Sequence, residues 1–126
     1  MAGEEQRYAL LGRFIDAWNA RDVDGLMDCM SADCAFHASS GPFAEGTQYQ
    51  GREAVRAGYA AIFEAFPDAQ WTNGRHFVLG ERGVSEWRFV GTSREGTKVE
   101  VDGCDLFVFD GDLIRLKDSY RKARTA

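Results

Sequence analysis

The sequence predicts an α+β fold in which three N-terminal helices pack on a curved, mainly antiparallel β-sheet and form a cone-shaped pocket. Two observations lead to this prediction. Hydrophobic residues recur at helical spacing in the first half of the chain, and from about residue 69 they alternate with polar ones. Nine Phe, four Tyr and three Trp, together with 14 glycines, suit a sheet that bends around large side chains. With 126 residues, the chain is expected to be a single domain spanning 1–126.

The helical part contains three segments. The first, residues 4–20, carries an apolar stripe at helical spacing. A second, short helix is expected from an Asp22 cap to about Ser31. The third begins at Arg52 and ends before Pro67, because proline disfavours a helical conformation in the residue that precedes it.

The remaining elements are strands and one long loop. A short strand is expected at 33–38, followed by a Ser- and Gly-rich loop at 39–50 that could cover the mouth of a cavity. Alternating polar and apolar residues, separated by turns that contain glycine, then predict a four-stranded antiparallel meander with strands at 69–79, 84–93, 97–109 and 112–121.

Composition argues against several classes of function. The formal charge of −5, from 20 acidic and 15 basic residues, disfavours binding to nucleic acid or to an anionic membrane surface. The N-terminus does not resemble a signal peptide, and no apolar run approaches the roughly 20 residues of a membrane helix. Cys29, Cys34 and His37 are close in sequence but lack a fourth ligand at zinc spacing. Because the three cysteines form no CxxC pair, we expect reduced thiols, a cytoplasmic location and no metal.

The most informative segment is the last predicted hairpin, GCDLFVFDGDLIRLKDSY. If Asp110 and Gly111 form a two-residue turn, Asp105 and Asp118 become diagonal neighbours about 5 to 8 Å apart on an apolar face. Two carboxyl groups this close in an apolar setting resist ionising together, which provides one acid and one base. A three-residue turn with a bulge would instead flip the register and place Lys117 beside Asp105.

A purely structural role is the alternative for Asp105 and for Asp118. Asp105 could pair with Arg88, and Asp118 could lie solvated near a sheet edge. The opposite face of the same strand carries Cys104, Leu106 and Val108, and a sheet that is apolar on both sides is usually covered on both. We therefore expect a homodimer through the outer face of the sheet.

The order of elements resembles a known superfamily. A glycine-led third helix ends in Phe66-Pro67, and the chain closes with the pattern F-x-F-D-G-D-L-I…D-S-Y. These features resemble the SnoaL-like polyketide cyclases, ketosteroid isomerases and limonene-epoxide hydrolases, which share the nuclear transport factor 2-like cone. The resemblance covers almost the whole chain and implies the fold, whereas the superfamily includes several reactions and non-catalytic members.

The resemblance also implies roles for individual residues. Asp105 matches a protonated aspartate that hydrogen-bonds an oxyanion in the steroid isomerases, and Tyr59 resembles a tyrosine that supports it. Asp118 matches a last-strand aspartate that acts as a base or positions water. The main catalytic tyrosine and the base of the isomerases fall at Phe14 and near Ala38, so orthodox steroid isomerisation is not expected.

Further candidates surround these residues. His37, beside the isomerase base position, is a candidate acid or base, although inward positions at Phe36 and Ala38 favour an outward, structural histidine. Eight side chains are expected to line a pocket for a flat hydrophobic ligand: Phe14, Trp18, Phe36, Phe63, Trp87, Phe89, Phe107 and Leu116.

These observations predict a small enzyme without a cofactor that performs acid–base chemistry on a hydrophobic small molecule with a carbonyl group. Isomerisation, cyclisation and dehydration are all compatible with them. In this hypothesis Asp118 moves the proton, while neutral Asp105, assisted by Tyr59, stabilises the enolate. The alternative is a non-catalytic dimeric protein that binds a small ligand on the same fold, with both aspartates as hydrogen-bond acceptors.

Overall fold

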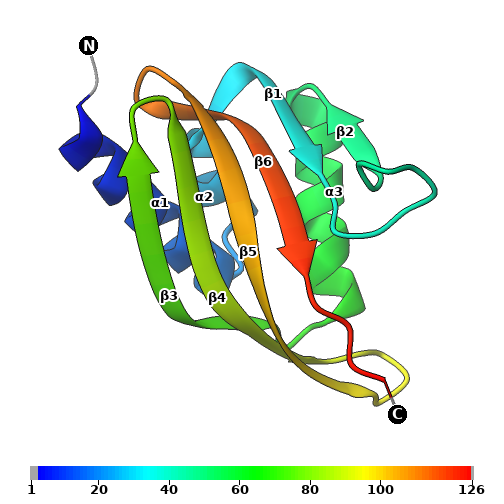
Figure 1. Cartoon of the computed structure of the whole chain (residues 1–126). Helices are drawn as coiled ribbons and strands as arrows, with labels where there is room; N and C mark the ends of the chain where they lie inside the picture. The colour runs from blue at the N-terminus through cyan, green and yellow to red at the C-terminus, as the bar shows by residue number, and fades with distance from the viewer. Residues whose placement is uncertain (1–2, 126) are drawn as a thin grey trace.

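The computed structural model describes residues 3–125, which form a six-stranded sheet with three helices on one face (Figure 1). The helices are α1 (Glu4–Ala20), α2 (Val23–Asp28) and α3 (Arg52–Ala65), and the strands are β1 (Met30–His37), β2 (Gln48–Gln50), β3 (Gln70–Leu79), β4 (Arg82–Thr92), β5 (Lys98–Asp110) and β6 (Leu113–Arg121). The strand order is β2-β1-β6-β5-β4-β3. The predicted α+β class is confirmed.

The helices begin where the sequence predicts them, and one ends earlier. α1 has the predicted bounds. α2 begins after the expected cap, where the Asp22 side chain accepts a hydrogen bond from the Gly25 backbone amide at 2.9 Å. It ends at Asp28 rather than near Ser31, because Met30 already pairs with β6 as the first residue of β1.

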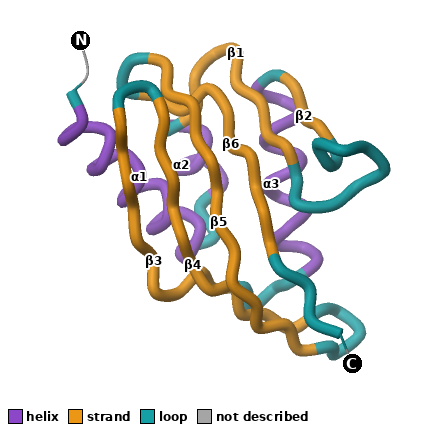
Figure 2. The backbone as a smooth tube through the Cα atoms, in the orientation of Figure 1, coloured by secondary structure: helices purple, strands orange, loops and turns teal. Residues whose placement is uncertain are grey.

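The four-stranded antiparallel meander is present as β3 to β6, and two further strands extend the sheet (Figure 2). β1 lies parallel to β6, whereas β2 pairs antiparallel with β1. β2 was not predicted from the sequence, because its three residues fall within a Gly- and Ser-rich segment that has the composition of a loop. α1 packs against β3 and α3 packs against β1, so the helices cover opposite ends of the same sheet face.

The β5–β6 hairpin contains an irregularity that decides which residues face inward. Close to the turn, Phe109 pairs with Ile114, and both are buried. The next pair joins Val108 to Leu116, so Arg115 is an extra residue on β6. Because successive strand residues point to opposite faces, this bulge reverses the direction of every later β6 side chain.

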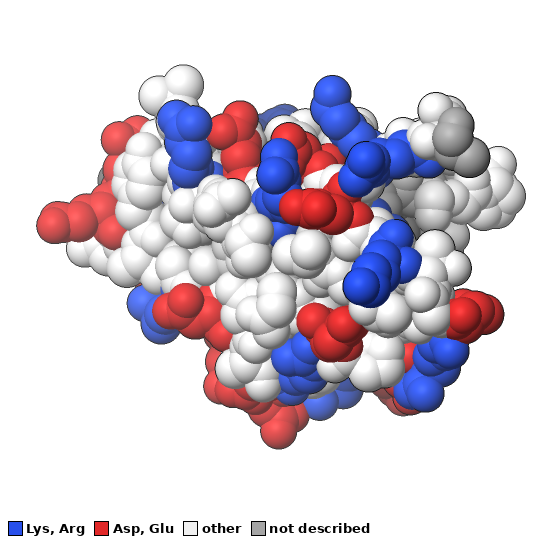
Figure 3. Space-filling model, turned by 90° about the horizontal axis from the view of Figure 1, so that it is seen from below, with Lys and Arg blue, Asp and Glu red and all other residues white. Residues whose placement is uncertain are grey.

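Charged residues of both signs are interspersed on the surface that Figure 3 shows from below. Lys and Arg side chains lie between Asp and Glu side chains, rather than in a patch of one sign. This face therefore lacks the basic stripe with which proteins hold a nucleic-acid backbone. No helix within residues 3–125 is long and apolar enough to cross a membrane.

Candidate active site

A polar network is buried on the inner face of the sheet. Its centre is Asp105 of β5, which is 5% exposed. The Trp87 indole donates a hydrogen bond to Asp105 Oδ2 at 3.0 Å, and the Ser119 hydroxyl donates one to Asp105 Oδ1 at 2.6 Å. Trp87 is on β4 and Ser119 is on β6, so the two neighbouring strands hold these donors on either side of the carboxylate.

Lys117 completes this network from β6. Its Nζ lies 3.2 Å from Asp105 Oδ1 and donates to Ser119 Oγ at 2.6 Å. The aromatic rings nearest to the amine, with centres 4.5 to 5.7 Å away, are those of Phe36, Trp18 and Tyr59. Burial lowers the pKa of Lys117 from its ordinary value of 10.5, and the Asp105 carboxylate opposes that shift. The network thus holds an amine, a hydroxyl and a carboxylate away from bulk water.

The network borders a cavity of about 230 Å³ between the helices and the sheet, which we call the inner cavity. Lys117, Ser119 and Arg121 of β6 contribute to its wall. The Arg121 guanidinium lies 4.6 Å from the centre of the Phe89 ring. Most of the remaining lining is aromatic or aliphatic: Trp18, Phe36, Tyr49, Ile62, Phe66, Trp71 and Trp87. The inner cavity therefore combines apolar walls with a few polar groups, as small-molecule sites do.

One hydrogen-bond donor beside the inner cavity is unused. Trp18 lines the cavity and is 4% exposed, and its Nε1 has no hydrogen-bond partner within residues 3–125. A buried N–H without an acceptor costs free energy, and most such groups are paired. This indole is therefore suited to donate a hydrogen bond to an oxygen atom of a ligand.

The prediction that Asp118 faces Asp105 was wrong. Asp118 lies on the outer face of the sheet, where its carboxylate accepts a hydrogen bond from the Tyr120 hydroxyl at 3.4 Å. The bulge in β6 is the physical reason, because it reverses the facing of the strand before it reaches Asp118. As in the alternative, Lys117 lies beside Asp105. The turn itself differs from both expectations, because Asp110 pairs with Leu113 and the two turn residues are Gly111 and Asp112.

Tyr59 and His37 are both separate from the carboxylate of Asp105. The Tyr59 hydroxyl is buried and donates to Met30 Sδ at 3.5 Å, and burial raises the pKa of this phenol well above 10.0. Tyr59 is therefore a neutral neighbour of Lys117, rather than the expected partner of Asp105. His37 is paired with Asp118 in the parallel β1–β6 ladder and shares its outer face, so the outward orientation of this histidine is confirmed.

The eight residues predicted to line the pocket fall into four groups in the structure. Those that border the inner cavity are Trp18, Phe36 and Trp87. Those buried in the core behind it are Phe14, Phe89 and Phe107. Phe63 is partly buried and packs against Trp18, with ring centres 5.2 Å apart. Leu116 was wrongly predicted to face the pocket, because it follows the bulge and lies on the outer face.

Asp105 belongs to a row of polar residues, most of which were not predicted from the sequence. The strand registers align four polar residues across the inner face: His76, Ser85, Asp105 and Ser119. His76 Nδ1 and Ser85 Oγ are hydrogen-bonded at 2.7 Å. The available signal was a polar residue at an inward position of several neighbouring strands, and in β6 the unrecognised bulge concealed it.

The cysteines do not contribute a metal site within the described part of the chain. No group of three or more His, Cys, Asp or Glu residues in 3–125 is arranged to hold a metal ion. Cys29 and Cys34 are buried free thiols, and burial raises the pKa of each. Neither thiol belongs to the lining of the inner cavity.

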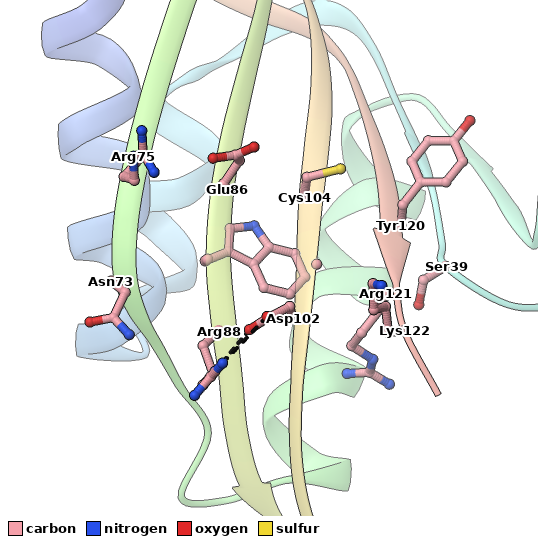
Figure 4. A pocket seen from close by; sticks show the side chains of 12 residues that line it. Ser39, Asn73, Arg75, Glu86, Arg88, Asp102, Cys104, Tyr120, Arg121 and Lys122 are labelled. Atoms are coloured by element: carbon pink, nitrogen blue, oxygen red, sulfur yellow. Dashed lines mark hydrogen bonds and ion pairs between the residues drawn. The ribbon is translucent and has the colours of Figure 1, made fainter. Parts of the chain in front are cut away.

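A larger hollow of about 670 Å³ lies on the outer face of the sheet (Figure 4). Gly103 lines it, and a Cβ at this position would lie 2.5 Å from carbons of the Trp87 ring, so the glycine is needed for that ring to fit. Arg88, a possible partner of Asp105 from sequence, instead pairs here with Asp102 at 2.8 Å. Because this charged pair is exposed and internally satisfied, we place the candidate active site in the inner cavity.

Fold and site together define a small α+β domain with a cavity of about 230 Å³ between helices and a curved sheet. The chain belongs to the SnoaL-like domain family, whose sequence profile matches residues 11–116. This match confirms the resemblance to the SnoaL-like superfamily. No protein of curated function has a significant sequence match to the chain.

Solved structures share this fold at low sequence identity. A predicted polyketide cyclase from Xanthomonas campestris pv. campestris is 17% identical, with a TM-score of 0.83 over 94% of this chain and 91% of that protein. A second predicted polyketide cyclase, from Silicibacter sp. TM1040, is 22% identical, with a TM-score of 0.82 over 94% and 90% of the two chains. A nuclear transport factor 2-like protein of unknown function from Mesorhizobium loti is 24% identical, with a TM-score of 0.77 over 94% and 93%. At these identities the comparisons establish the fold alone.

Proposed function

We propose that the protein binds a small, largely hydrophobic carbonyl compound in the inner cavity and moves a proton at the carbon next to the carbonyl. The observation that carries this proposal is Lys117, which lines the cavity and whose amine contacts both Ser119 and Asp105. Proton transfer at such a carbon is common to isomerisation, aldol-type cyclisation and dehydration. The family likeness to polyketide cyclases supports the same class of reaction by analogy.

Lys117 takes the role that the sequence had suggested for Asp118. Its lowered pKa makes the neutral amine more accessible, so that Nζ can accept a proton from the substrate. Ser119 and Asp105 orient the amine and hold positive charge in place when it becomes an ammonium.

The developing enolate oxygen requires hydrogen-bond donors. Trp18 lines the inner cavity and its Nε1 has no acceptor within residues 3–125, and Arg121 adds a positive charge to the same wall. Donors fixed in an apolar cavity stabilise an oxyanion more strongly than donors in water do. A flat compound with one carbonyl oxygen suits these donors and the aromatic walls.

A non-catalytic ligand-binding protein is the second candidate function. The observation that favours it is that both carboxylate oxygens of Asp105 already have partners: Asp105 accepts hydrogen bonds from Trp87 and Ser119 and pairs with Lys117. A network with every partner in place can serve to fix the structure of a core. This candidate predicts ligand binding without turnover.

Hydrogen–deuterium exchange of ketone α-protons tests the proposed function without knowledge of the natural substrate. In deuterated buffer, the wild-type protein is expected to accelerate α-exchange of small ketones such as cyclohexanone and acetophenone, measured by proton NMR. Absence of acceleration across a panel of small ketones that bind would contradict the enzymatic proposal and favour ligand binding alone.

A matched pair of variants on α3 locates the reaction. Ala61 is exposed at the cavity lining, so Ala61→Trp is expected to obstruct the cavity and slow exchange by about tenfold or more. Ala57 is exposed on the same helix and is not part of the lining, so Ala57→Trp is expected to leave the rate unchanged. Equal rates in both variants would place the reaction outside the inner cavity.

A further inference from the structure

Lys117 differs in its surroundings from the other lysines of this chain. The sequence contains three lysines and twelve arginines. Lys98 and Lys122 are exposed, whereas Lys117 is 5% exposed and borders a cavity. Arginine stays protonated under all ordinary conditions, while a buried lysine can lose its proton and act as a nucleophile. The residue type at this buried position therefore permits covalent chemistry.

We propose that Lys117 forms an imine with an aldehyde or ketone that occupies the inner cavity. This inference rests on the proposed function, because it specifies how the bound carbonyl compound is activated. A protonated imine makes the neighbouring carbon more acidic than the parent carbonyl compound does, because loss of the α-proton then gives a neutral enamine, so it serves isomerisation and aldol-type bond formation alike.

The groups around Lys117 supply the proton transfers that imine formation needs. The ammonium first gives one proton to the Ser119–Asp105 pair, 2.6 and 3.2 Å away. The amine lone pair then forms the C–N bond while the C=O π bond breaks, and the oxygen takes a proton from Nζ to give a carbinolamine. The Ser119–Asp105 pair returns its proton to the hydroxyl group, which leaves as water when the C–O bond breaks, and a protonated imine remains on Nζ. Ammonium and carbonyl compound thus yield protonated imine and water, with no oxidant or reductant.

A second feature of the cavity points to a carbonyl ligand independently. Trp18 lines the inner cavity, and its buried Nε1 lacks an acceptor within residues 3–125. The Trp18 ring centre lies 5.2 Å from Lys117 Nζ, so an oxygen held by this indole would lie near the amine. The same donor can hold the carbonyl oxygen before attack and the departing water afterwards.

Reductive trapping tests the imine directly. The full-length protein is incubated near neutral pH with benzaldehyde and cyanoborohydride, which reduces an imine to a stable benzylamine. Peptide mass mapping then measures the benzyl adduct on each lysine and on the N-terminal amine. Lys117 is expected to be labelled about tenfold faster than Lys98 or Lys122, because its environment lowers the pKa of its amine.

Variants distinguish a cavity reaction from surface labelling. Ala61→Trp keeps Lys117 but obstructs the cavity, and it is expected to suppress the Lys117 adduct, whereas Ala57→Trp preserves it. Adducts confined to Lys98, Lys122 and the N-terminus would overturn the proposal. If α-exchange persists in that case, Lys117 acts as a base without covalent chemistry; if exchange is also absent, the proposed function fails as well.

Discussion

Replacing Lys117 with methionine is expected to reduce ketone α-exchange by about 10²- to 10⁴-fold, the usual contribution of a general acid or base. Methionine has a similar length and fills the aromatic surroundings of the side chain, but it cannot accept a proton. Lys117→Arg retains the positive charge beside Asp105 and does not release its proton, so it is expected to be inactive too. Exchange is measured by NMR on variants whose circular dichroism spectra match the wild type.

Asp118→Asn provides the matched control for this prediction. Asp118 lies one residue from Lys117 in β6 but faces the outer side of the sheet. Its amide variant is expected to exchange ketones within about twofold of the wild-type rate, since the general acid–base contribution stays with Lys117. A large loss in Asp118→Asn together with normal rates in both Lys117 variants would contradict the assignment.

Replacing Asp105 with leucine is expected to lower the free energy of unfolding by about 3–5 kcal/mol, because it leaves Lys117 as a buried charge without a partner. The same change removes the acceptor of the Trp87 indole and of the Ser119 hydroxyl. Urea denaturation of the purified variant measures this loss.

A double variant tests whether the stability loss of Asp105→Leu arises from the broken ion pair between Asp105 and Lys117. Asp105→Leu combined with Lys117→Met removes both charges, and it is expected to recover much of the stability that either single change loses. Additive losses in the double variant would show that Asp105 and Lys117 do not interact in solution. That result would remove the physical basis of the candidate site.

The sequence was sufficient to predict the elements that have strong periodicity. α1, the Asp22 cap of α2, the end of α3 before Pro67 and the antiparallel meander were all expected from hydrophobic spacing and turn residues. β2 was not, because a three-residue strand at the edge of a sheet depends on pairing with β1 rather than on its own composition.

The sequence predicted the inward orientation of Asp105 at the candidate site but did not settle that of Lys117. Asp105 lies on β5, where inward and outward residues alternate without interruption, so its inward orientation followed from that alternation. In β6 a single extra residue, Arg115, exchanges the inward and outward sets. Whether a strand has a bulge depends on how it packs against its neighbours, so spacing alone left both Asp118 and Lys117 as candidates.

Which of the buried aromatic residues line the cavity could likewise not be predicted from the sequence. Periodicity identified Trp18, Phe36 and Trp87 as inward-facing, and all three border the inner cavity. It could not separate them from Phe14 and Phe107, which are equally buried but belong to the core behind the cavity. That division depends on the packing of helices against the sheet, which is a tertiary property.

NMR titration of the lysine side chains tests the central claim most directly, namely that Lys117 is held in an apolar cavity beside Asp105. With only three lysines in the chain, the Lys117 signal is assigned by its loss in Lys117→Met. Because burial outweighs the attraction of the carboxylate, this signal is expected to titrate with a midpoint below 10.5. A midpoint at or above 10.5 would show an amine that is solvated or dominated by its carboxylate partner, and would contradict the account.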